Sequence, residues 1–361
     1  MTGVLALLFL LVVFAETYDN LALNKSAWQQ TTWTGQLIPW GAAKAVDGQY
    51  TNRSAGGNQC SISNGGQQTA EWRVDLESKI SISHISIFYR TDNTPSPGAF
   101  YNRFAGFFVY VSNTTSRQDG HLCFHEIQTE DRTPTENQTI SCPVHGRYVI
   151  YYNERRRNMT YPSYYSTYAF SELCELEVIG CSDPTVYGEH CNQPCSDKCQ
   201  EQRCTITTGE CLGCIPGYQG PMCNQVCDNR RYGLECSSIC GNCSDGVTCN
   251  HVDGTCLNGC DVGVEGEKCQ TACRPGRYGK DCREICSANC LRQNQCNRFN
   301  GECYGGCQQG WKLPNCQKEC DGGLYGVNCS QSCGQCIGDQ QCHHINGTCL
   351  NGCSPGYMGI S

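Results

Sequence analysis

The sequence lacks several features, and each absence argues against a class of protein. It has no basic excess, because 26 Lys and Arg stand against 34 Asp and Glu, and the net charge of −8 argues against a nucleic-acid partner. It has no nucleophile motif near its scattered histidines, and "HEIQTED" (125–131) is not the two-His zinc motif, so we expect no enzyme. Only four of the 35 Cys lie in residues 1–180, which predicts an ordinary globular domain there.

The N-terminus carries the one long apolar run. In "MTGVLALLFLLVVFAET" (1–17) the apolar run ends at the small residue Ala15. This pattern predicts a secretory signal peptide at 1–15, and the run is too short to span a bilayer. Asn-x-Ser/Thr sequons also favour a secreted glycoprotein, or the extracellular part of a cell-surface protein. The sequons begin at Asn24, Asn52, Asn113, Asn137, Asn158, Asn242, Asn328 and Asn346.

The second half of the chain is a tandem array of Cys-rich units. "CSDPTVYGEHC", "CDNRRYGLEC", "CRPGRYGKDC" and "CDGGLYGVNC" begin at intervals of 46, 46 and 47 residues. Residues 181–361 hold 31 Cys and are rich in Gly, so crosslinks rather than an apolar core must hold them. This spacing predicts four repeats after the first domain, at 181–226, 227–272, 273–319 and a shorter 320–361.

Cysteines mixed with His and Asn, as in "CHHINGTCLNGC" (342–353), suggest either a metal site or disulfides. His343 and His344 are replaced by Asn297 and Arg298 in another repeat, and a structural zinc site needs its full ligand set. An oxidising compartment also favours disulfides. We therefore expect these cysteines to be disulfide-bonded.

The repeats resemble EGF-like repeats of the laminin-related kind found in multiple-EGF-like and scavenger-receptor proteins. The residues that carry this resemblance are the "YG" pairs, "NGTC", "GYQG" (217–220) and "GYMG" (356–359). Spacing alone leaves the connectivity open. The resemblance implies the pairs Cys181–Cys191, Cys240–Cys249, Cys243–Cys256, Cys260–Cys269 and Cys273–Cys282.

The last repeat is one cysteine short. In two earlier repeats the seventh Cys is followed by an eighth after eight further residues, and from Cys353 this spacing reaches position 362. The spacing therefore predicts that the chain is a fragment of a longer protein. Any membrane attachment would then depend on a missing C-terminal part.

Residues 19–180 predict an all-β domain. "KISISHISIFYR" (79–90) alternates Ile with polar residues apart from a slip at His84. "GFFVYVSN" (106–113), "GRYVIYYNE" (146–154) and "CELEVIG" (174–180) are also β-rich, and turn residues separate them. With no comparable helical pattern, an antiparallel β-sandwich is expected.

The same region resembles the fucolectin, or F-type lectin, domain. The resemblance rests on motifs in the family's order: "NLALNKSAWQ" (20–29), "AAKAVDGQ" (42–49), "EWRVDL" (71–76), "GRYV" (146–149) and "LCELEV" (173–178). It implies a β-jellyroll, with a galactose-binding-like fold, that carries sugar-binding loops at one end and a structural calcium site nearby. "AVDG" and "WRVDL" are also similar to the related discoidin-type sandwich.

The resemblance implies the disulfides Cys60–Cys174 and Cys123–Cys142. The first would bring Asp47 and Glu175 together, and calcium prefers such oxygen ligands. By the same resemblance, Asp47 and Glu175 give carboxylates, and mainly carbonyls come from Lys44, Gln49, Gln59 and Cys174. The alternative is that Asp47 shapes the turn at Gly48 and that Glu175 is a solvated charge.

The family's sugar motif is only partly present. "RTD" (90–92) supplies Arg90 and Asp92, and Arg103 stands in for a second Arg, but the family's His is replaced by Ile62. Two guanidinium groups can donate hydrogen bonds to vicinal hydroxyls. The alternative is that Arg90 and Arg103 are exposed loop charges.

A Tyr-rich stretch, "NERRRNMTYPSYYSTYAF" (153–170), lies between two expected strands. Its rings would extend a binding face, and "RRR" would attract anionic glycans. The simpler interpretation is a solvated loop that is glycosylated at Asn158.

Two functions are consistent with these patterns. The first is a calcium-containing, fucolectin-like recognition domain on an EGF-like stalk that binds cell-surface or microbial glycans, fucosylated ones included, as in scavenger-type or innate recognition receptors. The second is an adhesion or structural ectodomain that has lost sugar binding and binds protein or lipid headgroups.

Overall fold

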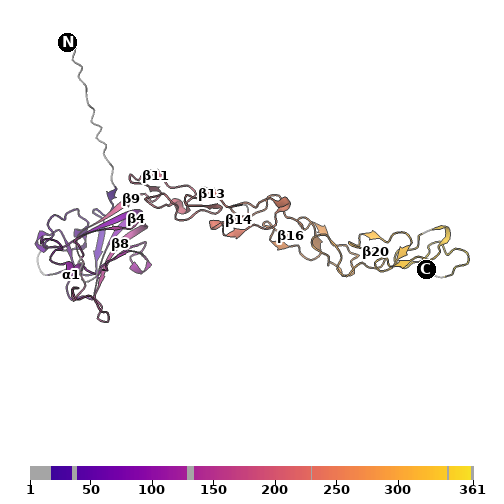
Figure 1. Ribbon diagram of the computed structural model, residues 1–361, viewed down its shortest axis with the longest axis horizontal. Helices are drawn as coiled ribbons and strands as arrows, with labels where there is room; N and C mark the ends of the chain where they lie inside the picture. Colours follow the sequence, from indigo (N-terminus) through magenta and orange to yellow (C-terminus); the bar gives the residue numbers. More distant parts are fainter. Residues whose placement is uncertain (1–17, 35–38, 128–133, 229, 340, 359–361) are drawn as a thin grey trace, which may run out of the picture. The chain divides into compact units, whose positions relative to one another are not determined.

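The computed structural model describes residues 18–34, 39–127, 134–228, 230–339 and 341–358 (Figure 1). The expected signal peptide at 1–15 lies outside these ranges. By its packing the chain divides into two compact units, Met1–Gly213 and Cys214–Ser361. No helix among the described residues is long and apolar enough to cross a membrane.

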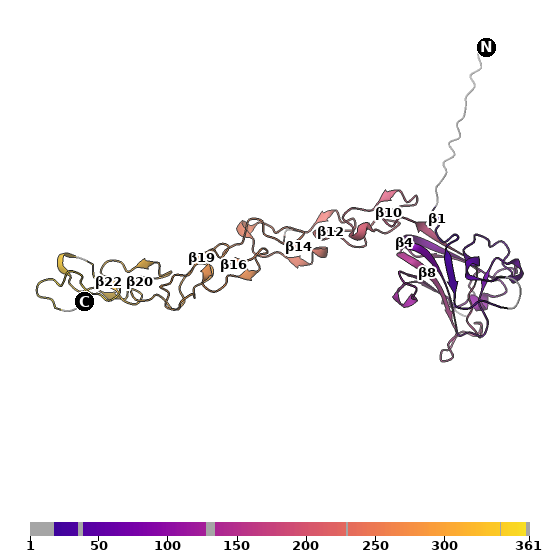
Figure 2. The same cartoon turned by 180° about the vertical axis from the view of Figure 1, so that it is seen from behind.

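The N-terminal region is an antiparallel β-sandwich built around one long strand, β4. β4 pairs with β2 before the irregularity at Asp75–Ile80, with β7 and β9 after it, and with β8 on both sides of it. Figures 1 and 2 show β8 beside β4. The described strands are β1 (Asp19–Asn20), β2 (Ser26–Gln29), β3 (Ser61–Ile62), β4 (Thr69–Tyr89), β5 (Phe108–Ser112), β6 (His121–His125), β7 (Asn137–Ser141), β8 (His145–Glu154) and β9 (Glu172–Cys181).

Along β4 the side-chain alternation explains the core. Ile80, Ile82, Ile85 and Ile87 are buried, and the spacing slips where the pairing with β9 shifts register between Ile82 and His84. An extra residue at such a bulge restores the inward direction of the following side chains. The prediction of an all-β fold with an N-terminal β-sandwich is confirmed.

Short helical turns connect the strands. Trp72 of β4 anchors one of them, because its indole N–H donates a hydrogen bond of 3.0 Å to the carbonyl of Ala42. The described turns are η1 (Ala42–Ala45), η2 (Ala55–Gly57), α1 (Tyr101–Phe104), η3 (Arg117–Asp119), η4 (Gln200–Gln202), η5 (Leu234–Cys236), η6 (Ser244–Gly246) and η7 (Ile337–Asp339).

The Cys-rich region consists of two-residue antiparallel pairs between turns, several of which are labelled in Figures 1 and 2. The pairs are β10 (Val186–Tyr187) with β11 (Gln193–Pro194), β12 (Tyr218–Gln219) with β13 (Gln225–Val226), β14 (Arg231–Tyr232) with β15 (Ser238–Ile239), β16 (Val264–Glu265) with β17 (Thr271–Ala272), β18 (Arg277–Tyr278) with β19 (Glu284–Ile285), β20 (Trp311–Lys312) with β21 (Lys318–Glu319), and β22 (Leu324–Tyr325) with β23 (Gln331–Ser332). Strands this short need crosslinks to persist.

Disulfides supply those crosslinks, and their pattern recurs in each repeat. All seven pairs that the resemblances imply are present among the described residues. The further pairs are Cys195–Cys204, Cys199–Cys211, Cys214–Cys223, Cys227–Cys236, Cys286–Cys296, Cys290–Cys303, Cys307–Cys316, Cys320–Cys329, Cys333–Cys342 and Cys336–Cys349.

Each repeat adds one tyrosine to its sulfur-rich core. In the second repeat, Tyr232 is buried with Cys243 and Cys249. A Cβ added to Gly254 would lie 2.5 Å from this ring, and Gly254 has a φ of +83°, so the turn requires glycine. The same ring-on-glycine contact joins Tyr278 to Gly301 and Tyr325 to Gly347, the glycine of "NGTC" (346–349). The "YG" and "NGTC" motifs are therefore the two halves of one packing contact.

Candidate functional site

A cluster of charged and aromatic side chains lies where β4 ends. Arg90 directly follows β4, and its backbone N–H donates a hydrogen bond of 3.0 Å to the carbonyl of Glu172 at the start of β9. Its guanidinium grips Asp92 with two hydrogen bonds, of 2.9 Å from Nε and 3.2 Å from Nη2. Arg90 is only 8% exposed, so it is not the exposed loop charge of the alternative interpretation.

Glu172 joins Arg90 to Arg103. Its Oε1 accepts hydrogen bonds of 3.0 Å from Nη1 of Arg90 and 2.8 Å from Nη1 of Arg103, which lies on α1. Glu172 is 1% exposed, and its Oε2 accepts no hydrogen bond from the described residues. Burial raises the pKa of Glu172, while the charges of Arg103 and Arg90 lower it. A buried carboxylate thus holds two guanidinium groups together.

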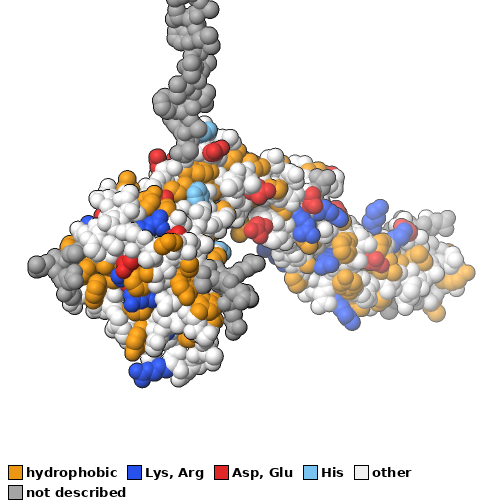
Figure 3. All heavy atoms as spheres, turned by 60° about the vertical axis from the view of Figure 1, so that its left-hand side comes forward, with side chains coloured by type: hydrophobic (Ala, Val, Ile, Leu, Met, Phe, Trp, Pro, Cys, Tyr) orange, Lys and Arg blue, Asp and Glu red, His pale blue; other side chains and the backbone are white. Residues whose placement is uncertain are grey.

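Aromatic rings fix the planes of these guanidinium groups. The guanidinium carbons of Arg90 and Arg103 lie 4.1 and 4.5 Å from the centroid of the Phe100 ring, and that of Arg103 lies 4.3 Å from the centroid of Phe170. Such stacking restrains a side chain that is otherwise flexible. Figure 3 shows basic side chains beside hydrophobic ones on the visible face of the protein.

The cluster presents unused hydrogen-bond donors. A guanidinium has five N–H groups, and the hydrogen bonds to described side chains use three in Arg90 but one in Arg103. The side chain of Arg103 is also 30% exposed, compared with 9% for Arg90. Arg103 is therefore the group through which a ligand would reach this cluster.

Ile62 lies opposite Glu172 in the pairing of β3 with β9, but its apolar side chain makes no hydrogen bond to the cluster. It is 1% exposed and packs in a separate buried group with Trp40 and the Cys60–Cys174 disulfide. A His at this position would place a polar ring in an apolar site, which costs stability. The Ile62 side chain offers no hydrogen bond where the resemblance places a His.

The stretch 153–170 is a solvated loop only in part. Arg155 is 5% exposed, and its Nη2 donates a hydrogen bond of 2.7 Å to the carbonyl of Ala105, while Asn153 donates one of 2.9 Å to the carbonyl of Arg103. "RRR" therefore does not act as one exposed basic patch, since its first member holds the backbone of the α1 turn. The exposed part includes Asn158, and the other seven sequon Asn residues are exposed as well.

The expected calcium residues gather around a second buried carboxylate. Glu175 is fully buried; its Oε2 accepts a hydrogen bond of 3.1 Å from the N–H of Gly48, and its Oε1 accepts none from the described residues. Burial, with smaller contributions from the charges of Asp47 and Glu177, raises the pKa of Glu175 to about 8. Glu175 is thus not the solvated charge of the alternative interpretation.

Asp47 faces the same loop but already has partners. Its Oδ2 lies 3.3 Å from Nζ of Lys44, and its Oδ1 accepts a hydrogen bond of 3.0 Å from the N–H of Gln49, as in an Asx turn. The Gln59 side-chain oxygen accepts a hydrogen bond of 2.6 Å from the N–H of Asn52. The oxygen-rich donor set and the orphaned Glu175 oxygen suit a hard cation, although the Lys44 ammonium competes for Asp47.

Residues 44–150 match a galactose-binding domain family. The family model, of the F5/F8 type C kind, is described as a NedA-like, galactose-binding domain. No curated protein matches the chain.

The sandwich is also similar to solved structures of carbohydrate-binding domains. The lectin domain of lectinolysin, complexed with Lewis B antigen, is 22% identical, with 45% of this chain and 96% of that chain covered and a TM-score of 0.34. A fucolectin from striped bass (Morone saxatilis) serum is 25% identical, and the match covers 45% of this chain and 49% of the fucolectin chain with a TM-score of 0.35. Chitosan-binding module 1 from Paenibacillus sp. IK-5 is 19% identical, with 45% and 100% covered and a TM-score of 0.33.

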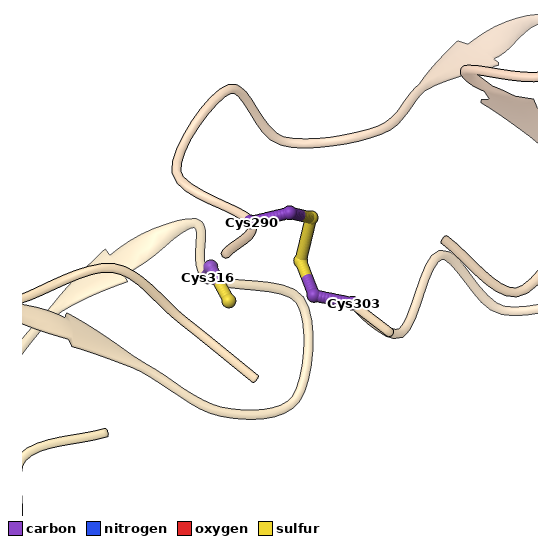
Figure 4. Close-up of side chains that lie close together, drawn as sticks. All are labelled: Cys290, Cys303 and Cys316. Carbon is purple, nitrogen blue, oxygen red and sulfur yellow. A yellow bond between two sulfur atoms is a disulfide. The ribbon is translucent and has the colours of Figure 1, made fainter. Parts of the chain in front are cut away.

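Three sulfur atoms in the third repeat also lie close enough to hold a metal ion. They belong to Cys290, Cys303 and Cys316. Figure 4 shows Cys316 beside the disulfide between Cys290 and Cys303, and Cys316 is itself bonded to Cys307. Sulfur in a disulfide is not the thiolate that binds metal, so this group is a structural core.

Sequence reasoning missed three members of the arginine cluster: Glu172, Phe100 and Phe170. Glu172 carries a signal in hindsight, since it is a charged residue at the start of the apolar strand β9. Phe100 and Phe170 carry none, because single aromatic residues in loops are common.

Proposed function

We propose that the N-terminal domain is a glycan-binding recognition domain, a binding module rather than an enzyme. The observation that carries this proposal is the pair of ring-stacked guanidinium groups on Glu172, with Arg103 partly exposed. The match of residues 44–150 to a galactose-binding family supports it.

Arg103 is the proposed main anchor for the sugar. Its unused N–H groups would donate hydrogen bonds to vicinal ring hydroxyls, and the carboxylate of Asp92, whose side chain is 36% exposed, would accept one. Arg90 has mainly a positioning role, because its hydrogen bonds to Asp92 and Glu172 hold the Asp92 carboxylate in place as the acceptor. Because Ile62 is buried, we propose weak binding of fucosylated or galactosylated glycans that depends on multivalent display.

Replacing Arg103 with Ala should weaken glycan binding about 10- to 100-fold, since each hydrogen bond from a charged donor contributes about 1.5–3 kcal/mol. The measurement is binding of the full chain to an array of immobilised fucosylated and galactosylated oligosaccharides. The matched control is Arg147→Ala, which removes another partly exposed Arg that pairs with a carboxylate, Asp75. Arg147→Ala should bind as the wild type does.

Equal binding by the Arg103→Ala and wild-type proteins would reject this site. The adhesion hypothesis, in which the sandwich binds protein or lipid headgroups, would then replace it, as it would if the wild type bound no glycan on the array.

We also propose that the Asp47–Glu175 region holds a structural calcium ion. Asp47 and Glu175 would give carboxylate oxygens, and Lys44, Gln49, Gln59 and Cys174 would contribute mainly carbonyls. The support is the buried Glu175 oxygen that accepts no hydrogen bond from the described residues, since a buried ionised carboxylate needs such compensation. When bound, the ion would supply positive charge that ties the Asp47 loop to β9.

Calcium should stabilise the domain, and more at higher pH. In the metal-free protein, the raised pKa of Glu175 means that the folded state holds its proton more tightly than the unfolded state. The resulting contribution to folding stability is complete below about pH 4.5 and is lost as the pH rises through about 8. Calcium binds the ionised carboxylate and reverses that loss. We expect chelation to lower the melting temperature little at pH 5 and markedly at pH 8.

Calorimetry of the full chain at the two pH values, with calcium or chelator, measures this difference. Asp47→Ala should erase it. A melting temperature that does not respond to calcium at pH 8 would count against the site.

We further propose that the Cys-rich region is an EGF-like stalk and that the whole is a secreted protein or receptor ectodomain of the scavenger or innate-recognition type. The support is the disulfide density, which oxidising compartments permit.

A further inference from the structure

A second candidate site lies on the outer face of the sandwich layer formed by β2, β4 and β8. Along β4, Trp72 and Val74 point into the core, so Glu71 and Arg73 point outward. Trp28 of β2 pairs in register with Arg73, and Tyr152 of β8 with Glu71. A groove of about 430 Å³ is lined by residues of this face, among them Trp28, Thr69, Glu71 and Tyr152.

A guanidinium group lies over each of two rings of this groove. That of Arg73 lies 3.9 Å from the centroid of Trp28, and that of Arg117 lies 3.9 Å from the centroid of Tyr152. Trp28 nevertheless remains 43% exposed, so part of its ring is open to a ligand. An exposed indole beside fixed polar groups can pack on the C–H face of a sugar ring.

The charges of the groove are largely paired with one another. Oε1 of Glu71 lies 3.3 Å from Nη1 of Arg73, and Oε2 of Glu71 lies 4.0 Å from Nη1 of Arg117. Oε2 of Glu154 lies 2.8 Å from Nε of Arg156. Arg73 and Glu154 do not line the groove but pair with lining residues; with them, three Arg stand against two Glu, a net charge of one positive unit, and the two carboxylates would repel an anionic ligand. The pairing therefore favours an uncharged occupant.

The polar groups of the groove match hydroxyl groups in kind. Gln30 and Thr69, which share a hydrogen bond of 3.2 Å, offer an amide and a hydroxyl, each of which can donate and accept. Glu71 offers acceptors and Arg117 offers donors. A sugar hydroxyl needs both, because it is donor and acceptor at once.

We propose that this groove is a second carbohydrate site, for a neutral oligosaccharide that packs on Trp28 and hydrogen-bonds to Glu71, Gln30 and Arg117. It shares no residue with the cluster of Arg90, Glu172 and Arg103 and does not depend on the function proposed for that cluster. Two sites on one domain would allow it to bind two sugars of one glycan, which raises the effective affinity.

The test uses the full chain on arrays of neutral and of sulfated oligosaccharides, followed by calorimetric titration with the strongest neutral binder. Trp28→Ala should weaken binding of one set of neutral glycans roughly tenfold, by loss of ring packing. Glu71→Gln should weaken the same set by loss of a charged acceptor. The matched control is Trp33→Ala, because Trp33 is 37% exposed but does not line the groove.

The outcomes separate this proposal from the one above. Loss in Trp28→Ala with retention in Arg103→Ala and Trp33→Ala supports the groove, even if the arginine cluster binds no sugar. Unchanged binding by Trp28→Ala, loss confined to sulfated glycans, or no neutral glycan bound by the wild type overturns it. Equal loss of the same glycans in Trp28→Ala and Arg103→Ala would overturn the claim of a separate site.

Discussion

Replacing Glu172 with Gln should lower the free energy of unfolding by about 3–5 kcal/mol and abolish binding at the arginine cluster, because it leaves two guanidinium groups without their shared counter-charge. Glu172 is 1% exposed and accepts a hydrogen bond from each Arg. Arg90 would keep its ion pair with Asp92, but among the described residues Arg103 pairs with no carboxylate other than Glu172. Denaturant unfolding of the full chain, followed by glycan binding of the folded fraction, measures both effects.

The matched control for this change is Glu77→Gln. Glu77 pairs with Lys25 at 2.6 Å, but its side chain is 67% exposed, and such surface pairs contribute at most about 1 kcal/mol. If Glu172→Gln were as stable as Glu77→Gln, the buried carboxylate would not be the link between the two arginines.

Removing the Cys60–Cys174 disulfide, as the double Ala variant, should cost the sandwich about 5 kcal/mol. The bond closes a loop with a sequence separation of 114 residues. In the chain-entropy model, a crosslink that closes a longer loop removes more conformational entropy from the unfolded chain, so its loss costs more stability. Both Cys residues are fully buried against Trp40 and Ile62, so the change also loosens that packing. The Asp47 loop and β9 would no longer be tied, and calcium stabilisation should disappear with the bond.

The control is the same double substitution at Cys123–Cys142. Its sequence separation is 19 residues, for which the chain-entropy model gives about 3 kcal/mol. Mass mapping of the purified protein must show the intended bond missing before unfolding is measured. An equal or smaller loss for Cys60–Cys174 than for Cys123–Cys142 would contradict the expected loop-length effect and the tie to calcium.

Local patterns in the sequence were enough for the fold class and for the organisation of the repeats. Ile80, Ile82, Ile85 and Ile87 predicted a strand with a slip at His84, and β4 has both features. The strand signal is local, because alternate residues of a strand face the same side whatever lies beyond. The recurring cysteines predicted disulfide-built repeats for a similar reason, since each repeat closes on itself over short separations.

The tertiary structure alone decided which residues form the sites. Arg103 on α1 and Glu172 on β9 are 69 residues apart in the chain, and only the folded domain brings Nη1 of Arg103 to 2.8 Å from Oε1 of Glu172. The sequence shows Arg155 only as a member of a basic run, but in the structure it is buried and donates a hydrogen bond to the carbonyl of Ala105, directly after α1. Ile62 is buried as well. The groove at Trp28 depends on the register between β2, β4 and β8, which no local pattern encodes. Side-chain direction and long-range pairing are set by the packed sandwich as a whole, so these sites emerge only with the fold.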